Sequence, residues 1–204
     1  MKKLISVLAI GLLILQSFTS GTNELTKEER AAGSAYLKET RDYFVEHVKG
    51  LSDAQLDFKA GPDKWTIRQC MEHIAKSESF IYTVMEKSLK AAANPDKKGD
   101  MKFSDEMIKT ALLDRTKKGQ APEPIQPHGE FKTVGEATDM FIKERNIHIS
   151  YIETTNDNLR DHLTPHPFFG MIDAYQWILL MSGHTKRHTL QIEEIMAAPG
   201  FPKN

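Results

Sequence analysis

Two histidines, His184 and His188, stand four residues apart in the stretch SGHTKRHTLQ, whose composition is that of a helix. Side chains at positions i and i+4 of a helix leave the same face about 6 Å apart, so two such imidazoles can reach one metal ion. The chain has eight histidines in 204 residues, and roughly 0.3 such pairs would arise by chance. The spacing therefore indicates a metal site only if the helix turns both rings inward and a third ligand exists.

The helix around this pair is predicted to run from about residue 172 to residue 197, and Pro199 and Gly200 follow its end. At 100° per residue, one stripe of this helix carries both histidines together with large apolar side chains and one amide. The members of the stripe are Trp177, Met181, His184, His188, Gln191 and Ile195. Both imidazoles are thus expected to point into the protein.

A second pair at the same spacing, His162 and His166, provides a contrast. Pro165 and Pro167 forbid a helix there, because proline lacks the backbone N–H that a helix needs. Helical spacing therefore cannot aim these two rings at a common point, and we expect them to lie away from the metal site.

The third candidate ligand, His73, lies near the start of another long helix. Thr66 and Gln69 form a capping box that begins this helix, and Trp65 and Cys70 are placed to pack across its first turn as a hydrophobic staple. One inward stripe of this helix holds Cys70, His73, Ser77, Phe80 and Val84. His73 is therefore expected to point inward from a firmly held helix end.

Three neutral imidazoles suit Zn²⁺, Ni²⁺ or Fe²⁺ and leave one coordination position open for water or substrate. The alternative is that these are ordinary core histidines, hydrogen-bonded to the backbone or to each other. Cys70 could supply a fourth ligand, although its place in the staple favours packing. Gln191 could contact a bound water or ligand, or cap a buried polar group. The only surface for a substrate that the pattern indicates is the apolar part of the stripe at Trp177 and Met181.

Other chemistries find less support in the residues. The chain has no glycine-rich phosphate loop, no nucleophile elbow around a serine and no carboxylate pair on an inward stripe. The acidic residues nearest the candidate ligands are expected on solvated helix faces: Glu72, Glu78, Glu193 and Glu194. Water activated by a metal is then the best candidate for the base of a reaction.

Two more helices complete the set. Capping boxes at Thr26–Glu29 and Thr133–Glu136 begin amphipathic stretches. The second of these carries an apolar stripe of Ala137, Met140, Phe141, Ile147, Tyr151 and Ile152, with His148 between its apolar and polar faces. Residues 94–132 are rich in Lys, Pro and Gly and predict a crossover with a short helix, and no useful β-alternation appears. We therefore expect an all-α, antiparallel four-helix bundle with a long crossover between helices 2 and 3.

The first 21 residues, MKKLISVLAIGLLILQSFTSG, have the basic start, short apolar core and small residues of a secretory signal peptide. The apolar core is short for a membrane span of about 20 residues, so we expect export to the periplasm or the cell exterior with no stable membrane insertion after cleavage. The domain is then residues 24–202. One cysteine excludes an internal disulfide, and a mixed-sign surface with net charge −1 argues against a nucleic-acid partner.

Two segments, GLSDAQLDFKAGPDKWTIRQCMEHIAKSE and HPFFGMIDAYQWILLMSGHTKRHTLQIEEIMAAPGFP, resemble the DinB-like superfamily in its YfiT-like branch. The resemblance extends from about Thr26 to Pro202. It implies a four-helix bundle in which one histidine of the second helix and a His-x-x-x-His pair of the last hold a divalent metal. The matching residues here are His73, His184 and His188. It also implies activation of water or a low-molecular-weight thiol, as in bacillithiol S-transferases and mycothiol-dependent maleylpyruvate isomerase.

The leading hypothesis is therefore a metal-dependent enzyme, a hydrolase or thiol S-transferase, acting on an unknown small-molecule substrate at a three-histidine site. Export argues against the thiol reaction, because those thiols are cytoplasmic cofactors. One alternative is a non-catalytic bundle of the cell envelope that binds metal or a small ligand. Another is a bundle whose histidines are structural and which acts through its surface. A homodimer is compatible with such a bundle, although no patch in the sequence argues for it.

Overall fold

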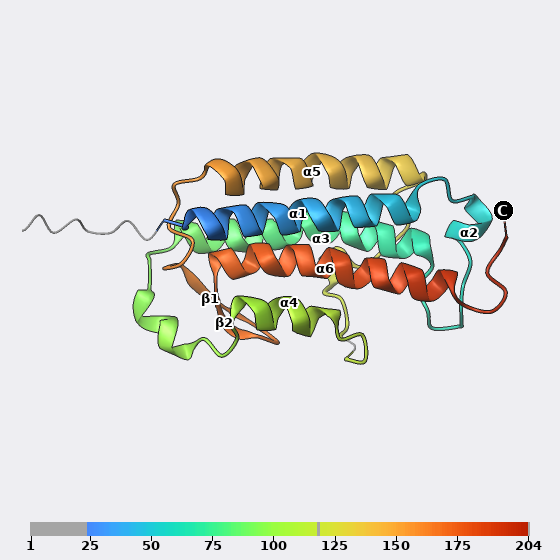
Figure 1. The fold of residues 1–204 in the computed structure, drawn as a ribbon. Coiled ribbons are helices and arrows are strands. Elements are labelled where there is room, and N and C mark those ends of the chain that lie inside the picture. The colour runs from blue at the N-terminus through green and yellow to red at the C-terminus, as the bar shows by residue number, and fades with distance from the viewer. Residues whose placement is uncertain (1–23, 118, 204) are drawn as a thin grey trace, which may run out of the picture.

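Four long helices form the body of the molecule in the computed structural model, which describes residues 24–117 and 119–203. They are α1 (Lys27–Val48), α3 (Ile67–Lys90), α5 (Val134–Thr154) and α6 (Ala174–Met196), with a short α2 (Asp53–Leu56) after α1 (Figure 1). The predicted all-α bundle with a long crossover is confirmed. The predicted signal peptide lies outside the described residues. Within the described part, no helix combines the length and apolar character that crossing a membrane requires.

Local sequence signals set the starts of three of these helices. At Thr26, Thr66 and Thr133 the hydroxyl accepts a hydrogen bond from the backbone N–H three residues on, and the side chain there accepts one from the threonine N–H. All three predicted capping boxes are thus confirmed. The start of α6 uses a different cap, because the Asp173 carboxylate accepts from the Gln176 N–H at 2.7 Å.

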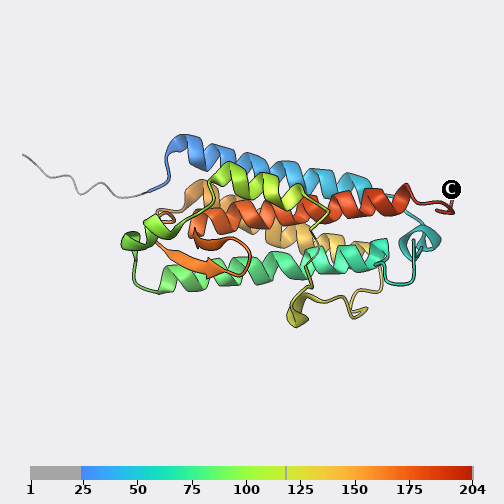
Figure 2. The same ribbon diagram turned by 90° about the horizontal axis from the view of Figure 1, so that it is seen from below.

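The crossover determines how the helices run. In Figure 1 the colour gradient shows α1 and α6 running in one direction and α3 and α5 in the other. Each helix packs on two of the others, α3 and α1 both contacting α5 and α6. Because α5 runs parallel to α3, the chain must return along the whole bundle, about 36 Å for a 24-residue helix. The return passes through η1 (Pro95–Asp100), α4 (Asp105–Leu113) and η2 (Glu123–Ile125), with α4 lying along α6 (Figure 2).

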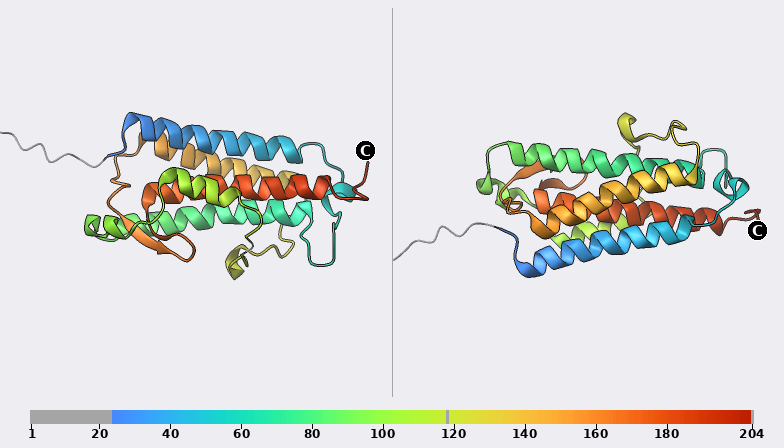
Figure 3. Two further views of the ribbon diagram at one scale, coloured as in Figure 1. Left: turned by 60° about the horizontal axis from the view of Figure 1, so that its bottom comes forward. Right: turned by 90° about the horizontal axis from the view of Figure 1, so that it is seen from above.

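A small antiparallel hairpin precedes α6, although no strand was expected. It pairs β1 (Leu163–His166) with β2 (Gly170–Asp173) near the bundle end where α6 begins (Figures 2 and 3). Four residues per strand are too few to produce a readable alternation. Ile172, predicted to open the last helix, pairs with Thr164 in this hairpin instead, so α6 starts two residues later.

The core divides into two apolar clusters. One gathers around Leu37, Ile81, Ile149 and Met181, and the other around Phe44, Ile74, Phe141 and Ile192. Between them, each long helix contributes a buried polar residue: Thr40 from α1, Glu78 from α3, Arg145 from α5 and Thr185 from α6. We call these four residues the polar layer.

The polar layer overturns two expectations from the sequence. Glu78 was expected in solvent but is buried, with both carboxylate oxygens 2.7 Å from Arg145 and a further hydrogen bond from His148. Burial alone would raise the pKa of Glu78, but the Arg145 charge and these hydrogen bonds hold it below its ordinary value. On α5 the inward stripe includes Arg145, whereas Ile147 of the predicted stripe is 50% exposed.

Candidate metal centre

The structure brings His73, His184 and His188 together between α3 and α6. One ring nitrogen from each lies within 4.8 Å of the other two, and Nε2 of His73 is 3.2 Å from Nε2 of His184. Two nitrogens bound to one tetrahedral zinc ion at 2.0–2.1 Å would be about 3.3 Å apart. The Nε2 atoms of His73 and His184 already have about this separation. The 4.8 Å limit for the whole group is wider, so small ring movements would bring all three nitrogens to the distances that a metal requires. Among the described His, Cys, Asp and Glu side chains, this is the group whose geometry fits an ion.

The helix packing explains why these rings meet. His73 lies in the second turn of α3, and the other two lie one turn apart on α6, which packs against α3. His73 and His188 are buried, whereas His184 is partly exposed. The side of His184 is thus the side on which the cluster approaches solvent.

Neighbouring oxygens fix the tautomers of two rings. Nδ1 of His73 is 2.7 Å from the backbone carbonyl of Ile125, and Nδ1 of His188 is 2.9 Å from Oε1 of Gln191. Oxygens of this kind only accept, so both Nδ1 atoms carry hydrogen and both Nε2 atoms keep a lone pair. Arg115 also donates to Oε1 of Gln191, at 3.3 Å, which supports the orientation of that amide.

The electrostatic surroundings keep the imidazoles neutral. Burial lowers the pKa of all three histidines, and that of His184 and His188 lies well below the ordinary value. The positive charge that a protonated neighbouring histidine would carry lowers the pKa of each of these two further. Neutral nitrogen donors are what a divalent ion requires, so the chemistry of the donor set agrees with its geometry.

The other three predicted site residues have different positions. Gln191 contacts His188 directly. Trp177 is buried two turns before His184, where its Nε1 donates to Thr164 Oγ1 at 2.8 Å. Cys70 packs in the apolar cluster around Phe44 and does not belong to the histidine group. Burial raises the pKa of the Cys70 thiol to about 12, so its environment favours packing over ligation.

Trp65, which directly precedes the capping residue Thr66 of α3, supports the site. Its ring lies 5.0 Å from that of His73 and 6.0 Å from that of His188, measured between ring centroids. The aromatic ring that was expected to staple the helix start is thus also in contact range of two of the clustered histidines.

Contacts of the hairpin and of the segment before it orient the other histidine pair, His162 and His166. Nδ1 of His162 is 3.1 Å from the carbonyl of Ser88, and Nδ1 of His166 accepts from the backbone N–H groups of Phe168 and Phe169. Neither belongs to the cluster of His73, His184 and His188. Burial lowers the pKa of His166 to about 4, and its ring packs on Trp177 instead.

Sequence reasoning missed two contributions from the crossover. The carbonyl of Ile125 contacts His73 and the guanidinium of Arg115 contacts Gln191, both from segments that the sequence predicted as a loop or a short helix. A backbone carbonyl has no side-chain signature, so the sequence carries no signal for Ile125. Arg115 follows α4 among other basic residues, and nothing in its spacing distinguishes it from a solvated arginine.

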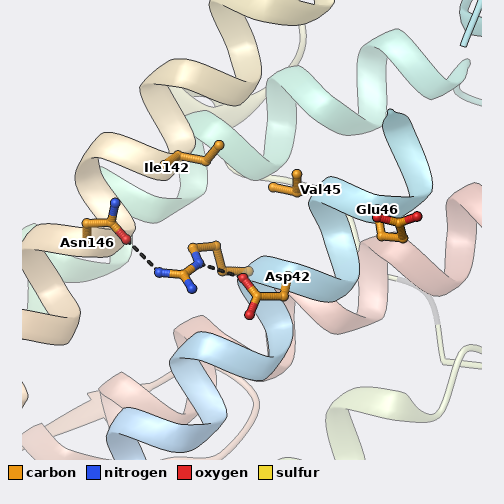
Figure 4. A pocket seen from close by; sticks show the side chains of 6 residues that line it. Asp42, Val45, Glu46, Ile142 and Asn146 are labelled. Atoms are coloured by element: carbon orange, nitrogen blue, oxygen red, sulfur yellow. Dashed lines mark hydrogen bonds and ion pairs between the residues drawn. The ribbon is translucent and has the colours of Figure 1, made fainter. Parts of the chain in front are cut away.

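A surface pocket elsewhere offers less chemistry. Figure 4 shows it between α1 and α5, lined by Arg41, Asp42, Val45, Glu46, Ile142 and Asn146. Arg41 donates to both Asp42 and Asn146, so these three polar side chains of the pocket are engaged with one another. None of the clustered histidines lines this pocket.

Comparison with known proteins agrees with the fold. A structure with TM-score 0.58 and 18% identity covers 87% of this chain and 91% of its own, and is described as YfiT from Bacillus subtilis, a probable metal-dependent hydrolase with an unusual four-helix bundle topology. The uncharacterized protein YuaE of Bacillus subtilis (strain 168) is 26% identical over 148 residues, which are 72% of this chain and 87% of YuaE. Residues 36–192 match the model of the DinB superfamily. With most of its length covered by that match, the chain belongs to the DinB superfamily.

Proposed function

We propose that His73, His184 and His188 hold a divalent metal ion and that the protein is a metal-dependent hydrolase. The observation that carries the proposal is the convergence of three neutral imidazoles, two of them held in the tautomer that leaves a lone pair on Nε2. Three protein ligands leave a position for another molecule, as catalytic zinc sites do. The description of YfiT as a probable metal-dependent hydrolase supports the same reading.

In the proposed site, the metal ion and the protein residues have different roles. A divalent ion held by these residues would supply Lewis-acid chemistry and would lower the pKa of a water or thiol bound to it. The chain orients the donors through Ile125 and Gln191, and burial excludes water from the rings of His73 and His188. The nearby acids are engaged elsewhere: Glu194 pairs with Arg115, and Glu72 binds backbone N–H groups. No described carboxylate is thus free beside the cluster to serve as a general base.

The donor set also limits which metal we propose. Imidazole nitrogens without thiolate or carboxylate suit zinc, nickel or iron, whereas magnesium and calcium prefer oxygen ligands. Elemental analysis of protein purified without a histidine tag would identify the ion that the protein retains.

The test of function uses the same preparation. Metal-free protein is reloaded with Zn²⁺, Ni²⁺ or Fe²⁺ and assayed against ester, amide and phosphoester substrates. We expect hydrolysis that depends on metal and disappears in His184→Ala, while the unfolding midpoint of the metal-free variant stays close to that of the wild type. A variant that retained tight metal binding would contradict the assignment of His184.

Two alternatives give different results in this panel. Transfer of a thiol to an electrophile, without hydrolysis, would make the protein a thiol S-transferase. Metal binding without turnover of any substrate would favour a non-catalytic binding protein. Absence of metal binding would leave the histidines with a structural role.

We also propose that the protein acts outside the cytoplasm, because its first 21 residues have the pattern of a signal peptide. N-terminal sequencing of the native protein should find a start near residues 20–23. An intact Met1 in the cytoplasmic fraction would contradict export and strengthen the case for thiol transfer.

A further inference from the structure

We infer that Glu72 is a positioning residue for the three-histidine site, because it holds the crossover where the Ile125 carbonyl orients His73. The inference rests on the metal site proposed above. It assigns a role to a buried carboxylate that the ligand set itself does not use.

The first observation is that His73 depends on the crossover for its orientation. Its Nδ1–H donates to the carbonyl of Ile125, 52 residues away, at 2.7 Å. This hydrogen bond leaves the Nε2 lone pair directed toward Nε2 of His184. Without the Ile125 carbonyl, either nitrogen of His73 could carry the proton and the ring could turn.

The second observation is how the crossover is held in place. Glu72 is 2% exposed, and its two oxygens accept from the backbone N–H groups of His128, at 2.7 Å, and Gly129, at 2.9 Å. Gly129 has φ of 79°, a left-handed conformation that glycine adopts without strain, so a glycine lies in the turn of the crossover that Glu72 contacts. Both oxygens of a buried carboxylate are thus satisfied by the crossover backbone.

Lys76 completes this attachment one turn further along α3. Its Nζ donates to the Gln126 carbonyl at 2.9 Å and to Glu130 Oε1 at 2.7 Å, and it lies 3.8 Å from Glu72. The two side chains therefore hold the crossover on both sides of residue 127. Glu72 directly precedes His73 on the helix, so the same turn of α3 supplies both the candidate ligand and the carboxylate that fixes its hydrogen-bond acceptor.

Two consequences follow from this connection. Release of the crossover should weaken metal binding, because a metal-ligating histidine loses affinity when the acceptor of its second nitrogen is lost. By thermodynamic reciprocity, metal binding should also stabilise the crossover against local opening. The crossover is thus a part of the metal site rather than only a connection between helices.

The test compares Glu72→Gln with Glu86→Gln, the same substitution at an exposed position of α3. In Glu72→Gln one carboxylate oxygen becomes an NH₂ group, which faces a backbone N–H and cannot accept from it. We expect zinc affinity, measured by competition with a chromogenic chelator, to fall about 10–100-fold in Glu72→Gln and to stay unchanged in Glu86→Gln. Amide hydrogen exchange at residues 125–130 should quicken, and long-range ¹H–¹⁵N spectra of the metal-free protein should show His73 losing its single Nδ1–H tautomer.

A second variant covers the case in which Glu72→Gln does not fold. Gly129→Ala changes only the crossover; no atom lies near the added methyl group, so the strain is confined to the backbone at positive φ. It should reproduce the loss of zinc affinity. Wild-type affinity and a single His73 tautomer in both variants would overturn the inference while leaving the metal site intact. Failure of the wild-type protein to bind zinc would instead overturn the proposed function and this inference together.

Discussion

Replacement of Arg145 by methionine should destabilise the protein severely. Every N–H of the Arg145 guanidinium has an acceptor: both oxygens of Glu78 at 2.7 Å, the Leu37 carbonyl at 3.0 Å, and the hydroxyls of Thr40 at 2.7 Å and Thr185 at 2.8 Å. Arginine has five such donors, so the site is fully matched. Methionine fills the space of the aliphatic stem but leaves the carboxylate without its counter-ion.

The magnitude follows from the loss of one member of a buried ion pair, which costs about 3–5 kcal/mol. That is a large part of the roughly 5–15 kcal/mol by which domains are stable. At about 2–4 °C per kcal/mol for a chain of this size, the melting temperature should fall by about 6–20 °C. Glu78 should become protonated in the variant, since Arg145 is the charge that keeps its pKa low.

Urea unfolding of the metal-free protein, followed by circular dichroism, measures this cost. Arg41→Met is the matched control, because Arg41 lies on the surface between α1 and α5; it should change the free energy of unfolding by less than about 0.5 kcal/mol. The double variant Glu78→Met/Arg145→Met should recover most of the loss, because a buried pair can be replaced by apolar side chains.

Two results would refute this reasoning. An Arg145→Met protein within about 1 kcal/mol of the wild type would show that the polar layer tolerates an unpaired carboxylate. A double variant whose loss equals the sum of the two single losses would show that Glu78 and Arg145 contribute independently.

Three further predictions concern the site and its supports. Thr66→Ala should lower the free energy of unfolding by about 1 kcal/mol in urea unfolding, through loss of the cap of α3. Trp65→Ala should cost about 2 kcal/mol, less than a fully buried ring, and should weaken zinc affinity in chelator competition, because the ring packs on His73 and His188; unchanged values for both would contradict its role. The folded metal-free protein holds His184 with a pKa below its unfolded value of 6.5. The free energy of unfolding should therefore decrease as the pH falls below that value. Urea unfolding at pH 7.5 and at pH 5 should show a smaller decrease in His184→Gln than in the wild type.

Much of the bundle could be predicted because its signals are local. Three capping boxes lie within four residues each, and the inward stripes of α3 and α6 follow from helical geometry alone. The same geometry brought His73, His184 and His188 onto inward faces. Their meeting at one point needed the packing of α3 on α6, which the resemblance to the DinB-like superfamily supplied before the structure did.

The parts that could not be predicted depend on partners far away in sequence. Burial of Arg145 could not be predicted, because an arginine is buried only when its donors are satisfied and its partner Glu78 is 67 residues away. Glu72 was wrongly expected on a solvated helix face for the same reason, since its carboxylate oxygens accept from distant backbone N–H groups of the crossover. The hairpin strands were too short to show a pattern.

The separation of the clustered histidines along the chain has a consequence for the order of folding. His73 and His184 are 111 residues apart, and α6 must dock against α3 before their rings meet. Closing so long a loop costs chain entropy that early contacts do not return. A metal ion at the proposed site would therefore not guide the first steps of chain collapse and would enter a bundle that is already assembled. Once bound, it would join distant segments, so it should slow unfolding far more than it speeds folding.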